Sequence, residues 1–160
     1  MCKKNNFLKI FGIIFLLFSF YTAFVIREEG LKFFFFIVTV CIFTDIGGYI
    51  FGKILKGPKL TAISPNKTYS GVMGSFTLSL IAALIFIDYF EIDTPQFYNL
   101  FFPLAISLVS QIGDIIISYF KRKAKLKDTG KILPGHGGLL DRIDGLIFVM
   151  PIYFIIRLFI

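Results

Sequence analysis

Apolar residues are gathered into five long segments, and short polar stretches between them hold most of the charged residues. The segments are Phe7–Ile26, Leu31–Leu55, Val72–Phe90, Tyr98–Phe120 and Leu146–Ile160. A helix needs about 20 mostly apolar residues to cross a bilayer, and the first four segments satisfy this length. The fifth is short, as a tilted or thin-spanning helix would be. The pattern predicts an all-α, polytopic membrane helix bundle with about five transmembrane helices.

Composition excludes a soluble domain. The chain has 160 residues, of which 56% are hydrophobic and 22 are Phe, and its mean hydropathy is +0.81. The first segment is too long for a signal peptide and lacks a cleavage site after Thr22, so we expect a retained helix. Cys2 is at the tip of the N-terminus and Cys41 is inside an apolar run, so the sequence implies no disulfide framework. We expect one integral membrane domain over residues 1–160.

The basic residues lie in alternate loops. One side receives the N-terminal lysines, the lysines between residues 53 and 67, and the basic run between residues 121 and 142. The opposite side has only Arg27, Lys32 and Arg157, together with four acidic residues. Cytoplasmic loops are enriched in Lys and Arg. We therefore expect the N-terminus and both polar loops in the cytoplasm, and we assign the net charge of +7 to topology, not to nucleic-acid binding.

Two acidic residues, Asp45 and Asp114, lie inside apolar segments, where each costs about 2.5–3.5 kcal/mol at a helix centre. Such acids indicate function, although pairing with a lysine for packing alone is the alternative. Asp114 belongs to a polar stripe at helical spacing, which should line a cavity open to the cytoplasm. The stripe consists of Ser107, Ser110, Gln111, Asp114, Ser118 and Lys121.

Small residues at four-residue spacing predict close helix packing. Gly48 and Gly52 follow Asp45 on one face of the second segment. Gly71, Ser75 and Ser79 repeat the pattern on the third segment, where packing is the expected role.

Both polar loops have residues suited to binding phosphate. Ser64, Asn66, Lys67 and Thr68 offer donors just before a helix start, which is a ready anion site, although an ordinary turn would look the same. The second loop, between Ser118 and Asp144, combines cations, carboxylates, several glycines and the only histidine.

The second loop closely resembles the signature of the phosphatidate cytidylyltransferase (CDP-diacylglycerol synthase) family. The matching pattern is Ser118-x-x-Lys121-Arg122, then Lys127-Asp128-x-Gly130, then Leu133-Pro134-x-His136-Gly137-Gly138-x-x-Asp141-Arg142-x-Asp144. Three upstream elements match as well: Asp45-x-x-Gly48-Tyr49-x-x-Gly52, Ser64-Pro-x-Lys67-Thr68-x-x-Gly71 and Gln111-x-Gly113-Asp114. The chain departs from the family at Ile117, where many members have Glu, and at Gly74-Ser75, where a Gly pair is usual.

The resemblance runs from about Cys41 to the C-terminus. Family members usually have several more helices upstream, so we expect residues 1–40 to be an abbreviated N-terminal part and residues 41–160 to be the catalytic part.

The resemblance implies that the protein transfers CMP from CTP to phosphatidate in the bilayer, giving CDP-diacylglycerol and pyrophosphate. Mg²⁺ is the implied cofactor, with Asp114 and Asp141 as first-choice ligands, and Asp144 and Asp45 as second choices or as ligands of a second cation. The implied catalytic set is Asp114, Asp141, Asp144, Lys121, Arg122, Lys127 and Arg142. The implied substrate-binding set is Ser64, Lys67, Thr68, Ser118, Asp128, His136, Gly137, Gly138 and Asp45. A bacterial inner (plasma) membrane is the expected location, and association into a homodimer stays open.

His136 is not needed as a general base, because a phosphomonoester with a second pKa near 6 is already largely ionised at pH 7. We expect it to hydrogen-bond phosphate or to orient the loop.

Three alternatives remain. A degenerate paralogue would bind lipid phosphate or CTP without turnover. A CDP-alcohol phosphatidyltransferase would need Asp-Gly-x-x-Ala-Arg, and Asp144-Gly145 is not followed by Ala-Arg. A small transporter would have no need of the Gly-, Lys- and His-containing loop.

Overall fold

The described part of the chain is helical. The computed structural model describes residues 3–61, 64, 67–91, 96–126, 129, 138, 140 and 143–158, apart from the side chains of residues 3–8, 96–98 and 158. It contains α1 (Lys3–Glu29), α2 (Leu31–Leu55), α3 (Tyr69–Tyr89), α4 (Gln96–Lys123) and α5 (Asp144–Leu158). The predicted all-α class is confirmed, with no strand in these residues beyond an isolated bridge between Lys59 and Thr68.

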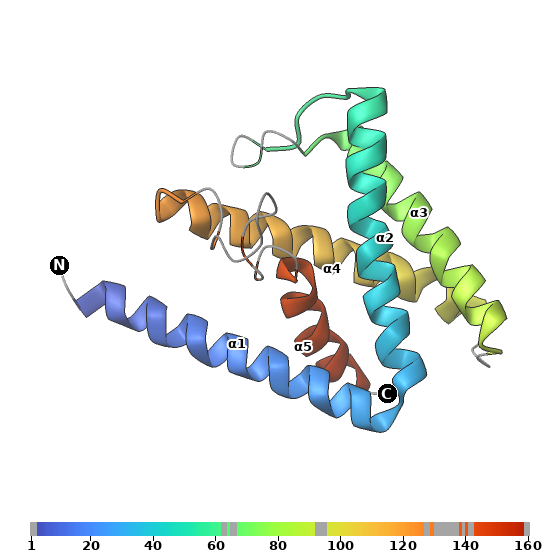
Figure 1. Ribbon diagram of the computed structural model, residues 1–160, viewed down its shortest axis with the longest axis horizontal. Coiled ribbons are helices and arrows are strands. Elements are labelled where there is room, and N and C mark those ends of the chain that lie inside the picture. The colour runs from blue at the N-terminus through green and yellow to red at the C-terminus, as the bar shows by residue number, and fades with distance from the viewer. Residues whose placement is uncertain are drawn as a thin grey trace.

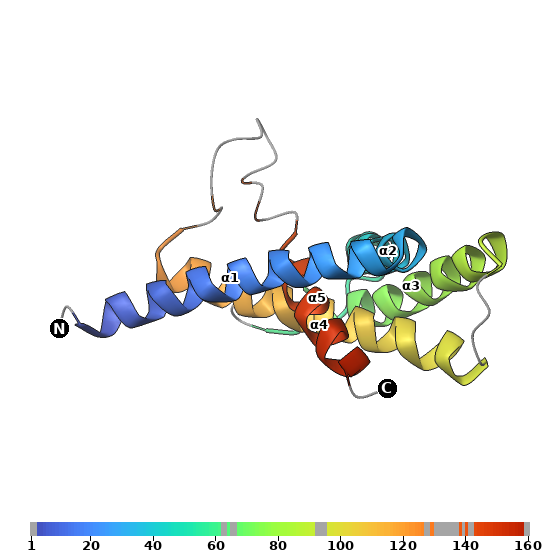
Figure 2. The same ribbon diagram turned by 90° about the horizontal axis from the view of Figure 1, so that it is seen from below.

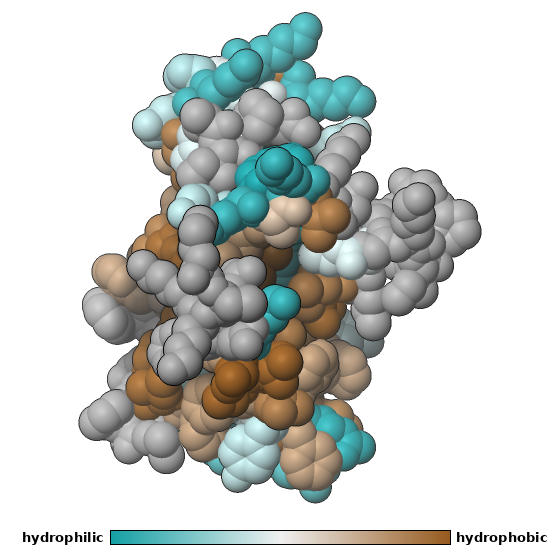
Figure 3. Space-filling view, turned by 90° about the vertical axis from the view of Figure 1, so that its left-hand side faces the viewer, coloured by the Kyte–Doolittle hydropathy of each residue, from teal (hydrophilic) through white to brown (hydrophobic). Residues whose placement is uncertain are grey.

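Four of the helices in this part of the chain, α1 to α4, are long and apolar enough to cross a membrane. Helix α5 has 15 residues, in keeping with the short fifth segment of the sequence. Large apolar side chains stay exposed on the outer faces of the helices, as a hydrocarbon environment requires. Figure 3 shows hydrophilic side chains at the two ends of the molecule and a smaller hydrophilic area within the apolar surface. The protein is an integral membrane protein.

The helices splay apart at one end. In Figure 1, α1 and α2 meet at Gly30 and diverge from there, while α4 and α5 occupy the space between them. The start of α1, the α2–α3 connection and the end of α4 all lie at the splayed ends (Figure 1). Figure 2 shows α5 between α1 and α4, and α5 contacts both.

Helices α2 and α3 make the most extensive helix contact. A Cβ added to Gly48 would lie 2.8 Å from Ser75 Oγ, and one added to Gly71 would lie 2.8 Å from the Gly48 carbonyl oxygen. Gly47, which sequence reasoning did not single out, approaches the Gly74 backbone in the same way. Ser75 Oγ also donates to the Thr44 carbonyl at 2.7 Å. The predicted packing role of the small residues is confirmed.

Helix α5 is held against α1 by both apolar and polar contacts. The rings of Phe15 and Phe148 lie 5.0 Å apart, and Arg157 forms an ion pair with Glu29. Ser19 Oγ lies 2.8 Å from the Ile147 carbonyl oxygen in a buried hydrogen bond. This helix carries Asp144 at its first turn, so its placement decides where that carboxyl lies.

Candidate functional site

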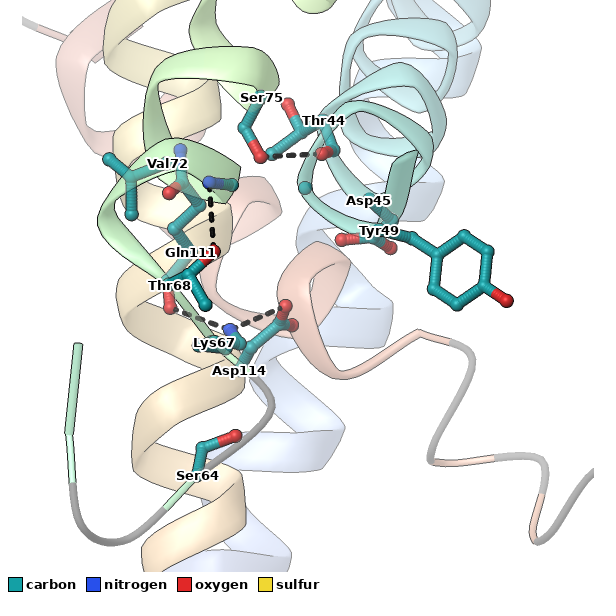
Figure 4. Close-up of a pocket in the computed structure, with 12 residues that line it drawn as sticks. Thr44, Asp45, Tyr49, Ser64, Lys67, Thr68, Val72, Ser75, Gln111 and Asp114 are labelled. Carbon is teal, nitrogen blue, oxygen red and sulfur yellow. Dashed lines mark hydrogen bonds and ion pairs between the residues drawn. The ribbon is translucent and has the colours of Figure 1, made fainter. Parts of the chain in front are cut away.

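A polar cavity of about 230 Å³ lies between α2, α3 and α4, and Ser64, Lys67 and Thr68 of the segment between α2 and α3 are in its lining (Figure 4). Its lining combines an acid from α2, an acid and an amide from α4, and hydroxyl and ammonium groups from the loop. The lining residues are Thr44, Asp45, Gly48, Tyr49, Ser64, Lys67, Thr68, Gly71, Val72, Ser75, Gln111 and Asp114. The prediction that the polar stripe lines a cavity is confirmed for Gln111 and Asp114.

Local hydrogen bonds hold the described residues of the segment before α3. Lys56 ends α2 in the left-handed region, with φ 44°, and turns the chain. The Leu60 N–H donates to the Lys67 carbonyl at 2.8 Å, and the Lys67 N–H donates to the Ser64 carbonyl at 3.0 Å. Thr68 is the N-cap of α3, and its hydroxyl accepts from the Gly71 N–H at 3.1 Å. These bonds hold the Lys67 backbone at the mouth of the cavity.

Lys67 reaches across the cavity to α4. Its Nζ lies 3.0 Å from Asp114 Oδ2 and 3.4 Å from the Gln111 carbonyl oxygen. The two side chains are 27% and 15% exposed, so the ion pair is largely shielded from solvent. The other carboxylate oxygen, Asp114 Oδ1, is buried and has no hydrogen-bond partner among the described residues.

A second acid, Asp144, lies beside Asp114 at the start of α5. Its Oδ2 lies 3.8 Å from Lys121 Nζ. Gly145 allows Asp144 to lie beside Asp114, because a Cβ there would collide with Ser110 Oγ and lie 3.2 Å from Asp114 Oδ1. Asp144 precedes the apolar part of α5, and burial raises its pKa to about 8. The Asp114 carboxylate adds to this rise and the Lys121 ammonium opposes it.

This pair of carboxyls fits a divalent cation. Asp114 offers a buried oxygen without a partner, and the two neighbouring carboxyls repel one another when both are ionised. Mg²⁺ prefers such hard oxygen ligands and commonly uses one or two carboxylates together with substrate phosphates. The described residues contain no group of three or more His, Cys, Asp or Glu side chains placed to hold a metal.

The buried end of the polar stripe on α4 does not line the cavity. Ser107 and Ser110 are fully buried, and Gln111 Nε2 donates to Ser107 Oγ at 3.3 Å. Ser118, half-buried on the same helix, does not line the cavity. Arg122 is exposed, and its guanidinium donates to the Leu126 carbonyl at 3.4 Å.

The remaining predicted site residues divide into two groups. Asp45 and Ser64 line the cavity, and Gly138 is buried. Six lie outside the described residues, namely Lys127, Asp128, His136, Gly137, Asp141 and Arg142. Sequence reasoning did not predict the pairing of Lys67 with Asp114 or of Lys121 with Asp144. It also passed over Thr44, which lines the cavity beside Asp45 and could have been noticed as a polar neighbour within the same apolar segment.

Comparison with known proteins finds one family and bacterial relatives with names of the same kind. The model of a family described as "Cytidylyltransferase family" matches residues 3–160. A phosphatidate cytidylyltransferase of Bacillus subtilis (strain 168) is 43% identical over 134 residues, which are 82% of this chain and 50% of the relative. One of Staphylococcus saprophyticus is 42% identical over 127 residues, which are 79% of this chain and 49% of the relative. The chain thus spans about half the length of these curated relatives.

One solved structure shares the fold. It is described as "Structural insight into an intramembrane enzyme for archaeal membrane lipids biosynthesis". The similarity has a TM-score of 0.50 at 17% identity and covers 76% of this chain and 77% of the other.

Proposed function

The chain belongs to the cytidylyltransferase family, and on this premise we propose that it transfers CMP from CTP to phosphatidate, forming CDP-diacylglycerol and pyrophosphate. The observation that carries the proposal is the Lys67–Asp114 ion pair. It joins two family-like motifs that are 47 residues apart in sequence, inside one polar cavity of a membrane bundle. The names of the bacterial relatives support the same reaction.

In the proposed reaction a phosphate oxygen of phosphatidate attacks the α-phosphorus of CTP. The new P–O bond forms as the bond to the β-phosphate oxygen breaks, and pyrophosphate leaves with the electron pair. The attacking phosphate is already largely ionised at neutral pH, so the protein has little proton transfer to perform. Its task is to bring two anions together and to stabilise their charge.

Lys67 and Lys121 are the described cations placed for this task, since each lies beside one of the two neighbouring acids. In the proposed reaction the Lys67 ammonium would exchange the Asp114 carboxylate for a phosphate oxygen. Lys127 and Arg142, proposed from the sequence, would add to the grip on phosphate.

Asp114 and Asp144 would hold Mg²⁺, with Asp141 proposed from the sequence as a further ligand and Asp45 as a residue for a second cation. The bound ion would neutralise triphosphate charge. We further propose that the enzyme lies in a bacterial plasma membrane, with the N-terminus and both polar loops in the cytoplasm. The Lys and Arg distribution supports this orientation.

The test is CDP-lipid formation by the purified protein from labelled CTP, phosphatidate and Mg²⁺. We expect turnover by the wild type and by Asp88→Asn, a control at an exposed carboxyl of α3. Asp114→Asn should be inserted in the membrane but inactive. Product formation by Asp114→Asn at the wild-type rate would remove Asp114 from the site. CTP binding by the wild type without any product would instead identify a binding protein that has lost turnover.

A further inference from the structure

A second, apolar cavity of about 120 Å³ lies between α1, α2 and α5. It is lined by Ser19, Phe20, Ala23, Phe34, Val38, Ile143, Leu146, Ile147 and Met150. The one polar side chain among these, Ser19, has its hydroxyl directed to the Ile147 carbonyl oxygen. Several walls are only half-buried and Phe20 is 59% exposed, so the cavity is a groove open at the outer face of the described helices. We call it the α1–α2–α5 groove.

Both long walls of this groove lead to the polar site. One wall begins at Ile143, the residue directly before α5, and continues on α5 at helical spacing to Met150. On α2, Val38 and Asp45 are seven residues apart, which places them on one helix face about 10 Å from each other along the axis. Helices α2 and α5 run in opposite directions past the groove. Asp144 is at the start of α5, and Asp45 follows Val38, the last groove residue of α2. The carboxyls therefore lie at the same end.

The other apolar cavities lack this continuity. One of about 230 Å³ lies between α2 and α3, lined by Thr39 and Phe43 of α2. By helical geometry these residues are on the side of α2 away from Asp45. Another, between α4 and α5, has a volume of only about 20 Å³.

We propose that one acyl chain of phosphatidate lies in the α1–α2–α5 groove while its phosphate occupies the site at Asp114, Asp144 and Lys121. The inference rests on the proposed function and adds the part of the molecule that binds the acyl chain of the lipid. A lipid whose phosphate is held beside Asp144 has its chains anchored within a few ångströms of Ile143, and the groove offers apolar walls in the direction that the chains must take. Residues at the far end of the groove, Phe34 and Met150, then set how well a long chain fits.

The first arm of the experiment narrows the groove from two different helices. Val38→Trp acts from α2 and Ala23→Phe acts from α1, while Leu84→Trp is the control. Leu84 is 46% exposed, lies on α3, and lines neither the groove nor the polar cavity. CDP-lipid formation is measured in mixed micelles with dioleoyl and with dihexanoyl phosphatidate. We expect both groove variants to raise KM for the dioleoyl substrate about tenfold, the factor that corresponds to a loss of about 1.4 kcal/mol in lipid binding, and to leave KM for dihexanoyl phosphatidate and CTP unchanged. The control should change neither.

Retained turnover of the short-chain substrate shows that a variant is folded. Equal loss with both substrates would mean that Val38 and Ala23 are only structural, and equal efficiency with both would mean that the groove is not used. Either result overturns the proposal.

The second arm does not depend on turnover. A phosphatidate with a diazirine near the middle of one chain is photolysed on the wild-type protein, and the labelled peptides are identified by mass spectrometry. We expect labels within residues 143–150 and 20–38, displaced by dioleoyl phosphatidate and not by phosphatidylcholine. Displacement by both lipids would identify a groove for ordinary bilayer lipid. Protein–protein crosslinks in place of lipid labels would identify a contact between two copies. Specific labelling without any CDP-lipid product would retain the groove and reject the proposed reaction.

Discussion

The hydrogen bond between Ser19 and Ile147 compensates for a proline. Pro151 lies inside α5 and has no N–H, so the Ile147 carbonyl, four residues earlier, loses its helical donor. Ser19 Oγ on α1 supplies a donor at 2.8 Å. The same oxygen lies 2.9 Å from the Phe15 carbonyl, but that carbonyl faces the Ser19 N–H of its own helix. The Ser19 hydroxyl therefore stabilises the protein most by donating to the Ile147 carbonyl, which lacks its helical donor.

Ser19→Ala should leave a buried carbonyl without a donor. Such a group costs about 1–3 kcal/mol in soluble proteins, whereas hydrogen bonds between membrane helices average about 0.6 kcal/mol and reach about 1.7 kcal/mol. We expect a loss of about 1 kcal/mol. In a Pro151→Ala background the residue at 151 regains an N–H that can bond Ile147, so adding Ser19→Ala should cost almost nothing. The expected coupling in the double-mutant cycle is about 1 kcal/mol.

The assay is unfolding of the four proteins in mixed micelles by increasing denaturing detergent, followed by circular dichroism. Thr22→Val is the control, since Thr22 is equally buried but its hydroxyl donates to the Ser19 carbonyl of its own helix at 2.9 Å. It should show no coupling to Pro151→Ala. Additive costs for Ser19→Ala and Pro151→Ala would refute the compensation, as would a Ser19→Ala variant as stable as the wild type.

Three further predictions address packing, orientation and chemistry. Gly47→Ala should destabilise the protein by about 1–3 kcal/mol, because the new Cβ would meet the Gly74 backbone. Gly12→Ala is the control and should not destabilise it, because the space around Gly12 is open. Thermal unfolding of both variants checks this. A cysteine replacing the exposed Lys125 in a cysteine-free background should react with an impermeant maleimide in inverted vesicles but not in intact cells. From the sequence alone, we expect His136→Gln to lower kcat/KM by less than about tenfold, which is well short of the effect of losing a general base. Arg142→Lys should lower kcat/KM further, because Lys cannot replace the bidentate hydrogen bonding of Arg to phosphate. Rates measured over a range of pH would contradict this if the His136 variant were inactive throughout and the Arg142 variant nearly normal.

The helices could be predicted from the sequence because their signals are local. The bounds of α2 match the predicted segment, since Gly30 precedes it and Gly57-Pro58 follows it. Asp114 could be assigned to a cavity because helical spacing alone puts it in line with the other polar residues of α4.

The pairings within the site could not be predicted, because they depend on how helices distant in sequence pack together. Nothing near Lys67 indicates that its ammonium meets Asp114 and not Asp45, and both acids line the same cavity. The compensation of Pro151 by Ser19 is likewise visible only once α1 lies against α5.

The Lys67–Asp114 ion pair also bears on the order in which the chain is built into the membrane. Helices α2 and α3 and their connection form a contiguous hairpin whose close glycine contacts are local, so it can assemble before α4 is made. Lys67 is then already in place when α4 arrives with an acid that is costly within an apolar segment. The bond between them lowers that cost only when α4 docks in the correct register beside the hairpin. The residues proposed to handle phosphate thus also select the arrangement of the helices that carry them.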